Sequence, residues 1–240
     1  MRLNSFLASC GVASRRKSEL IIFSGRVQIN NKIVLAPFLD VGEDDVVKVD
    51  GEIVKLPEKF VYYVMNKPAG YVCAASDKYD PVILDLLPAE KNKTRLFPVG
   101  RLDKESEGLI IITNDGKFTQ SILHPSSNIK KTYEALLNLP VNDKKLSIWQ
   151  RGFKNSDGHL LKPLSIKILK REPENFWVSV EIIEGLKREV RLMARNAGFN
   201  VKRLIRRKIG KMILKDLETG GFVDLSISDL QYKIFSGGAV

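Results

Sequence analysis

Cysteine and histidine are scarce in this chain of 240 residues. There are two cysteines, Cys10 and Cys73, and two histidines, His124 and His159. The cysteines stand far apart in the chain, which favours reduced thiols in a cytoplasmic protein over a disulfide framework. The four residues lack the spacing of zinc ligands, so we expect no metal site.

Long hydrophobic runs and familiar cofactor motifs are also missing. No stretch of about 18 apolar residues occurs, so the sequence predicts no membrane-spanning helix. The first residues, MRLNSFLASCG, are too polar for a secretory signal. The chain has no Gly-rich phosphate loop, no dinucleotide-binding glycine pattern and no G-x-S-x-G elbow. These patterns therefore give no reason to expect a bound cofactor.

Negative charge is in short supply, with 28 acidic residues against 39 Lys and Arg and a net charge of +11. The excess gathers in two regions. Residues 1–35 hold six basic residues and one acid, and residues 184–215 hold eleven basic residues and two acids. This layout favours a polyanion bound at two places, with nucleic acid as the leading candidate. The alternative is a basic protein whose acidic residues cover these patches.

Residues 1–58 predict a small module of two helices and a hairpin sheet. Apolar residues at helical spacing predict a first helix over residues 3–10. Ser14 is a candidate N-cap for a second helix that starts near Arg15 and ends at Gly25. Alternating residues then predict strands at 27–29, 32–35 and 45–51. Four basic residues on this module are candidate phosphate contacts: Arg15, Arg16, Lys17 and Arg26.

Residues 59–240 predict a larger, strand-rich domain, so the fold class is α+β. We place the boundary in the polar stretch 51–59, GEIVKLPEK. Strands are expected within residues 60–66, 109–112, 130–139, 177–185, 201–210 and 220–226, and helices within 118–124 and 187–198. The second of these helices would carry Arg188, Arg191 and Arg195 on one face.

The stretch GRLDKESEGLIIITNDG, residues 100–116, holds Asp103 just before an apolar run that predicts a buried strand. Two interpretations are open. Asp103 is a carboxylate positioned for chemistry, or it is a loop acid that pairs with Arg101. The other acids of this segment are typical of a solvated turn, so they do not form an obvious catalytic pair.

The segment FPVGRLDKESEGLIIITNDG resembles the signature of the RsuA/RluB group of ribosomal RNA pseudouridine synthases. The resemblance extends over nearly the whole chain. LASCGVASRRKSELIIFSGRVQIN is similar to the S4-like RNA-binding domain of that group. NKPAG, HPSSNIKKTYEALL and EGLKREVRLMARNAGFNVKRLIRRKIG match its later motifs in order and spacing.

The resemblance implies an S4-like domain in residues 1–58. It also implies a catalytic domain in residues 59–240 with a mixed, mostly antiparallel sheet and flanking helices. The implied reaction is the isomerisation of a uridine in ribosomal RNA to pseudouridine without a cofactor. By this resemblance Asp103 is the nucleophile, and Tyr133 stacks on the flipped base and is a candidate proton acceptor. Arg191 pairs with the aspartate, and Arg101 helps to fix the catalytic loop.

The implied partner is ribosomal RNA or a ribosomal precursor particle, bound by a cytoplasmic monomer. We add Arg188 and Arg195 to the candidate phosphate contacts, and we take Lys67 and Pro68 as structural. A large-subunit site is favoured over a small-subunit site. A non-catalytic RNA-binding assembly factor is the rival, although GRLD is intact, and no recognition helix supports DNA binding.

Three positions depart from the group. Glu189 and Leu192 stand where Gln and Arg are more usual, and Asn31 stands where a Gly often closes the first hairpin. Glu189 places a negative charge near the expected site, so we expect the local network there to be rewired.

Overall fold

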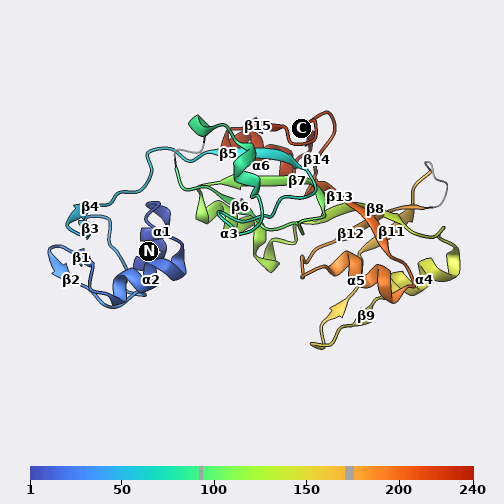
Figure 1. Ribbon diagram of the computed structural model, residues 1–240, viewed down its shortest axis with the longest axis horizontal. Helices are drawn as coiled ribbons and strands as arrows, with labels where there is room; N and C mark the ends of the chain where they lie inside the picture. Colours follow the sequence, from blue (N-terminus) through green and yellow to red (C-terminus); the bar gives the residue numbers. More distant parts are fainter. Residues whose placement is uncertain (92–93, 171–175) are drawn as a thin grey trace. The chain divides into compact units, whose positions relative to one another are not determined.

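The computed structural model describes residues 1–91, 94–170 and 176–240, and Figure 1 shows its elements. The chain divides into two compact units, formed mainly by residues 1–60 and by residues 61–240. No helix within these described residues is long and apolar enough to cross a bilayer. The class is α+β, as predicted.

The first unit packs two helices against a small antiparallel sheet. Helix α1 spans Leu3–Ser9 and α2 spans Arg15–Phe23. Ser14 caps α2, because its hydroxyl oxygen accepts a hydrogen bond from the Lys17 N–H at 3.3 Å. The sheet order is β2-β1-β3-β4, with β1 at Val27–Ile29, β2 at Lys32–Ile33, β3 at Val47–Val49 and β4 at Glu52–Ile53. Its core holds Leu3, Leu7, Ile22, Val27, Ile29, Val41, Val47 and Val49.

Strand β4 corrects the prediction that residues 51–59 form only a polar connection. Glu52 pairs with Val49 across the Asp50-Gly51 turn, where φ is 52° and then 86°. An Asp-Gly pair favours a two-residue hairpin turn, so the signal was present in the sequence. The predicted turn at Asn30-Asn31 has the same left-handed backbone, with φ of 51° and 64°.

The second unit is built on one large sheet, whose main path runs β11-β12-β8-β13-β7-β5-β15. Its pairings are antiparallel except for β13 with β7 and β14 with β16, which confirms a mixed, mostly antiparallel sheet. The path strands are β11 Ser165–Ile168, β12 Trp177–Ile182, β8 Lys131–Leu137, β13 Val201–Ile209, β7 Glu107–Thr113, β5 Tyr62–Lys67 and β15 Phe222–Asp224. The remaining strands are β6 Phe97–Val99, β14 Met212–Ile213 and β16 Gly238–Ala239, with a separate hairpin of β9 Phe153–Lys154 and β10 Leu160–Leu161.

Helices pack near both ends of this sheet. Figure 1 shows α4, Asp143–Arg151, and α5, Glu189–Asn196, side by side near β11 and β12. Helix α6, Ile227–Phe235, and helix α3, Gly116–Leu123, share a core with β5 and β7. The described part of this unit also contains three 3-10 turns: η1 Ile83–Leu86, η2 Ala89–Lys91 and η3 Pro125–Ser127. The apolar segment PVILDLLP, residues 81–88, contains η1, in which Ile83 and Leu84 are buried.

The two halves of the sheet meet where β7 and β13 run parallel, through the pairs Ile205–Glu107 and Arg206–Gly108. Gly108 has φ of 104°, and a Cβ there would lie 2.4 Å from the Arg206 carbonyl oxygen. Only glycine permits so close an approach of the two backbones. The loop before β7 is thereby brought to the middle of the sheet.

Candidate active site

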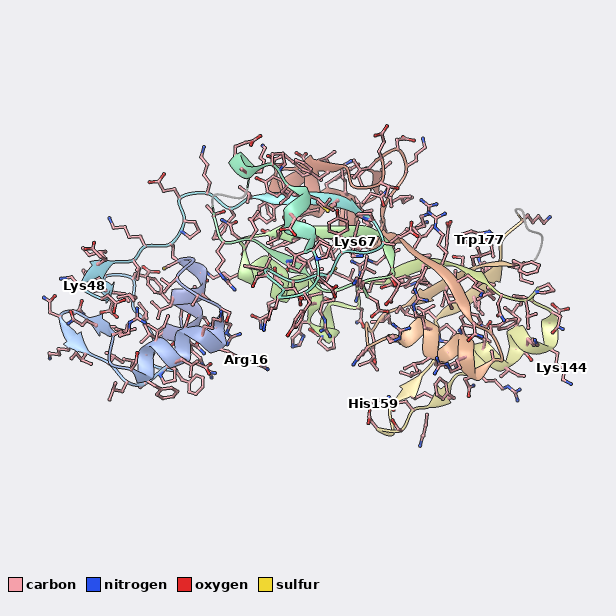
Figure 2. The ribbon with its side chains drawn as sticks, in the orientation of Figure 1. Arg16, Lys48, Lys67, Lys144, His159 and Trp177 are labelled. Atoms are coloured by element: carbon pink, nitrogen blue, oxygen red, sulfur yellow. The ribbon has the colours of Figure 1, made fainter. Side chains whose placement is uncertain are left out.

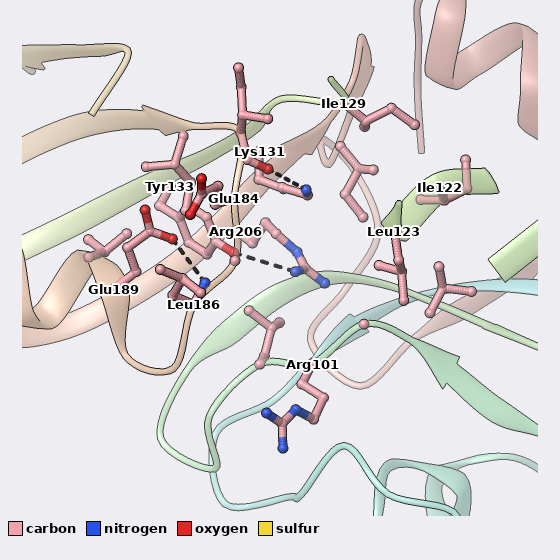
Figure 3. Close-up of a pocket in the computed structure, with 18 of the residues that line it drawn as sticks. Arg101, Ile122, Leu123, Ile129, Lys131, Tyr133, Glu184, Leu186, Glu189 and Arg206 are labelled. Carbon is pink, nitrogen blue, oxygen red and sulfur yellow. Dashed lines mark hydrogen bonds between the residues drawn. The ribbon is translucent and has the colours of Figure 1, made fainter. Parts of the chain in front are cut away.

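Asp103 lies in the loop before β7, at the edge of a cavity of about 810 Å³. The predicted buried run, Leu109 to Ile112, is inside β7 and fully covered. Figure 3 shows two kinds of wall in the cavity. One is apolar and includes Ile122, Leu123 and Ile129, and the other is polar and includes Lys131, Tyr133, Glu184 and Glu189. A planar ring with polar groups at its edge would fit between these two walls.

Buried Lys67 fixes the loop that follows Asp103. Its ammonium donates to the carbonyl oxygens of Pro68 at 2.9 Å, Lys104 at 3.2 Å and Ser106 at 2.7 Å. An ammonium has three donors, so these three acceptors satisfy it. Burial lowers the pKa of Lys67, and neighbouring acids act in the opposite direction. Figure 2 shows Lys67 within the second unit, and its contacts agree with the structural role predicted for the Lys-Pro pair.

The structure brings Arg191 to Asp103. Arg191 Nε lies 3.8 Å from Asp103 Oδ2, and among the described residues this nitrogen has no hydrogen-bond partner. The rest of the guanidinium is anchored, because Nη1 donates to the Val201 carbonyl at 3.0 Å and Nη2 to the Ser106 hydroxyl at 3.4 Å. Burial lowers the pKa of Arg191, Arg188 lowers it further, and Asp103 opposes both. The cation is thus held still with one N–H facing the carboxylate.

Arg188 does not share the helical face of Arg191, and that part of the prediction is wrong. Helix α5 begins at Glu189, and Arg188 precedes it in the left-handed region with φ of 56°. Its Nη1 lies 3.4 Å from Glu105 and 3.8 Å from Asp103. The helix begins two residues later than predicted, and the Arg188 side chain reaches the acidic loop. Arg195 stands in the last turn of α5 and is exposed.

Tyr133 lies on β8 directly opposite Arg206 of β13. The ring is buried, and the hydroxyl oxygen accepts a hydrogen bond from Arg206 Nη1 at 3.4 Å. Arg206 was not singled out from the sequence, although the alternation of β13 places it on the same face as buried Leu204. Tyr133 is both a core aromatic and a lining residue of the cavity.

Glu189 is buried beside the cavity and accepts a hydrogen bond from the Leu186 N–H at 3.0 Å. Burial raises the pKa of this carboxyl. Lys131 lines the same wall and donates to the Ile183 carbonyl at 2.6 Å. Burial lowers the pKa of Lys131, as does Arg206, whereas Glu189 raises it. Glu189 therefore lies on the same cavity wall as the partly buried Lys131.

The other predicted site residues are exposed. Arg101 lines the cavity with an exposed side chain. Arg15, Arg16 and Lys17 are exposed at the start of α2, and Figure 2 labels Arg16 there. Arg26 differs from them, because its guanidinium binds both carboxylate oxygens of Asp50, with Nε at 2.7 Å from Oδ1.

A carboxylate near a fixed cation, and an aromatic ring that lines the same cavity, suit covalent chemistry on a planar ring. A family model described as RNA pseudouridylate synthase matches residues 61–196. The chain belongs to this family. A second model, the S4 domain, matches residues 1–47 of the synthase. The family resemblance found in the sequence is confirmed. The chain is an enzyme that isomerises uridine in RNA.

Relatives cover the synthase almost end to end. An uncharacterized RNA pseudouridine synthase of Aquifex aeolicus (strain VF5) is 38% identical over 233 residues, which are 96% of this chain and 92% of the relative. Ribosomal large subunit pseudouridine synthase B of Bacillus subtilis (strain 168) is 34% identical over 229 residues, or 94% of this chain and 92% of the relative. A crystal structure of a pseudouridylate synthase superposes with a TM-score of 0.70 at 28% identity, covering 96% of this chain and 98% of that one.

Proposed function

We propose that the synthase converts one uridine of ribosomal RNA, at a large-subunit site, with Asp103 as the nucleophile. The observation that carries the chemistry is the position of Asp103, whose carboxylate stands at the cavity edge and 3.8 Å from Arg191 Nε. At this distance the guanidinium attracts the carboxylate and helps to hold it in place. The large-subunit assignment is supported by relatives named ribosomal large subunit pseudouridine synthase B.

In the proposed reaction the Asp103 carboxylate forms a transient bond to the target nucleotide, and the bond between C1′ and N1 breaks. The freed uracil turns, and C5 is joined to C1′. C5 then loses its proton, N1 gains one, and the carboxylate is released. Substrate and product are isomers, so the atoms balance without a cofactor or co-reactant.

Tyr133 is proposed to stack on the flipped base. Extrusion of a base costs a few kcal/mol, and an aromatic ring recovers about 1–3 kcal/mol by stacking. Its hydroxyl, next to Arg206, is also the candidate acceptor for the C5 proton. Arg101, exposed on the loop beside Asp103, is proposed to help to fix the catalytic loop.

RNA is proposed to contact basic residues of both units: Arg15, Arg16, Lys17, Arg26, Arg188 and Arg195. The exposed residues at the start of α2 fit this role best, because each can meet a phosphate without giving up a protein partner. We take residues 1–58 and 59–240 as the two domains and a monomer as the working unit. Both cysteines are free, which fits the proposed cytoplasmic location.

The test compares pseudouridine maps of ribosomal RNA from cells with and without the gene. One large-subunit pseudouridine should disappear, whereas loss of a small-subunit position would correct the subunit. Purified Asp103→Asn should bind the RNA normally and form no pseudouridine. An unchanged map would favour a non-catalytic assembly factor, and turnover by Asp103→Asn would remove Asp103 from the chemistry.

A further inference from the structure

Arg206 combines deep burial with an incompletely satisfied guanidinium. The residue is 4% exposed. Nε donates to the Leu109 carbonyl at 2.7 Å, and Nη1 donates to the Tyr133 hydroxyl at 3.4 Å. Nη2 is buried and has no hydrogen-bond partner among the described residues. A buried donor left unpaired is costly, so it calls for an explanation.

The position of Arg206 suggests what the donor serves. Arg206 lines the cavity, and Figure 3 shows its guanidinium between the wall that holds Tyr133 and the wall that holds Leu123. Four buried side-chain atoms in the described chain lack partners, and Nη2 of Arg206 is the one whose residue lines this cavity. The unpaired donor therefore belongs to a residue of the cavity wall, and the Nη2 atom itself is buried just behind that wall.

The backbone holds Arg206 in this place. It is paired with Tyr133 on one side and with Gly108 on the other, so its position is set by both neighbouring strands. Two of its three nitrogens are tied to protein oxygens, which aims the third. A guanidinium fixed in this way is a directional donor, and it loses little rotational freedom when it binds.

We propose that Arg206 Nη2 donates a hydrogen bond to a carbonyl oxygen of the target uracil. This inference rests on the proposed function, because it takes the cavity as the site of the flipped base. Uracil carries carbonyl acceptors at positions 2 and 4, whereas cytosine carries an amino donor at position 4. A donor that meets O4 therefore selects uracil over cytosine, and one that meets O2 orients the ring between Tyr133 and the apolar wall.

The test uses single-atom changes in the RNA. The mapped ribosomal RNA segment is prepared with uridine, 2-thiouridine or 4-thiouridine at the target position. Single-turnover rates are then measured with saturating wild-type enzyme and with Arg206→Met. Sulfur is a weaker acceptor than oxygen, so the wild type should slow about tenfold or more on one of the two sulfur substrates. The affected position identifies the oxygen.

Arg206→Met should be slow on the uridine segment and should show no further slowing on that sulfur substrate. Its RNA affinity should stay within about threefold of wild type, since no phosphate contact is lost. A purely structural role of Arg206 would slow all three RNAs equally and leave the sulfur effect intact. That outcome, or a wild type insensitive to both sulfur substitutions, overturns the proposal.

Two controls keep the result decisive. If near-UV circular dichroism shows that Arg206→Met is not folded, Arg206→Lys replaces it. Lysine keeps the charge but cannot reach Leu109, Tyr133 and the base together, so the sulfur effect should again be lost. If the wild type makes no pseudouridine in the unmodified segment, the proposed function fails. If the wild type converts the unmodified segment but the variants keep the sulfur effect, the role of Arg206 is refuted and the proposed function stands.

Discussion

The synthase carries its positive charge in two different settings. At the start of α2, Arg15, Arg16 and Lys17 are exposed. Lys67 beneath the Asp103 loop and Arg206 in the cavity wall are buried, and each donates to protein oxygens. The same residue types thus serve different ends: exposed cations attract a polyanion over a distance, and buried cations hold geometry. Net charge alone does not separate the two roles, whereas burial does.

The largest effect should come from Lys67→Met. The change removes one hydrogen bond from each of three carbonyl oxygens, of which that of Lys104 keeps the Gly70 N–H as a donor, and it loosens the turn after Asp103. We expect a loss of about 3 kcal/mol in unfolding free energy and loss of turnover. Urea denaturation and a pseudouridine assay measure the two. Lys167→Met, an exposed strand lysine on β11, is the matched control and should change neither. Equal effects in both variants would refute the anchoring role.

The second-largest effect should distinguish the three arginines of residues 188–195 from one another. Arg191→Met should cut the single-turnover rate by about 100-fold or more while it keeps RNA affinity and its salt dependence, because Arg191 faces Asp103. Arg195→Met should weaken binding and leave the rate at saturation intact. Arg188 contacts Asp103 and Glu105, so Arg188→Met should show part of both effects. If Arg191→Met behaves like Arg195→Met, Arg191 binds phosphate instead.

The exposed cations should determine how steeply RNA affinity falls with salt concentration. Replacing Arg15, Arg16 and Lys17 by alanine should lower the log–log salt slope of RNA binding by about 0.9 for each lost duplex-phosphate contact. Arg26→Ala should change the slope less, because Arg26 is already held by Asp50. Affinity measured at several salt concentrations decides this. An unchanged slope in the triple variant would exclude α2 from the RNA interface.

The smallest effect concerns Glu189. Burial raises its pKa in the folded state, so the stability that it contributes is complete below its unfolded pKa and is lost as pH rises through the folded value. Glu189→Gln removes the charge and keeps an acceptor for Leu186 N–H. It should be more stable than wild type at pH 7 by less than about 1 kcal/mol, with no gain at pH 4. Unfolding curves at both pH values test this, and a gain independent of pH would contradict it.

The sequence predicted helices α1, α2, α3 and α5, most strands and the position of Asp103, because these rest on local spacing, caps and turns. Helices α4 and α6 and strand β11 were not predicted. It also predicted that Arg191 lies near Asp103, through resemblance rather than through spacing. The placement of Arg188 was wrong, since the start of α5 depends on the left-handed residue before it. Arg206 was missed because its burial follows from pairing with β7 and β8, which are distant in the sequence.

The seam between β7 and β13, with Gly108 at its centre, also sets when the enzyme becomes active during synthesis. Asp103 and β7 are synthesised before β13, whereas Arg191 and Arg206 belong to later segments of the chain. Domains assemble as the chain leaves the ribosome, N-terminal parts first. The carboxylate therefore emerges long before its cationic partners, and the nascent synthase has no assembled site until β13 is released and closes against Gly108.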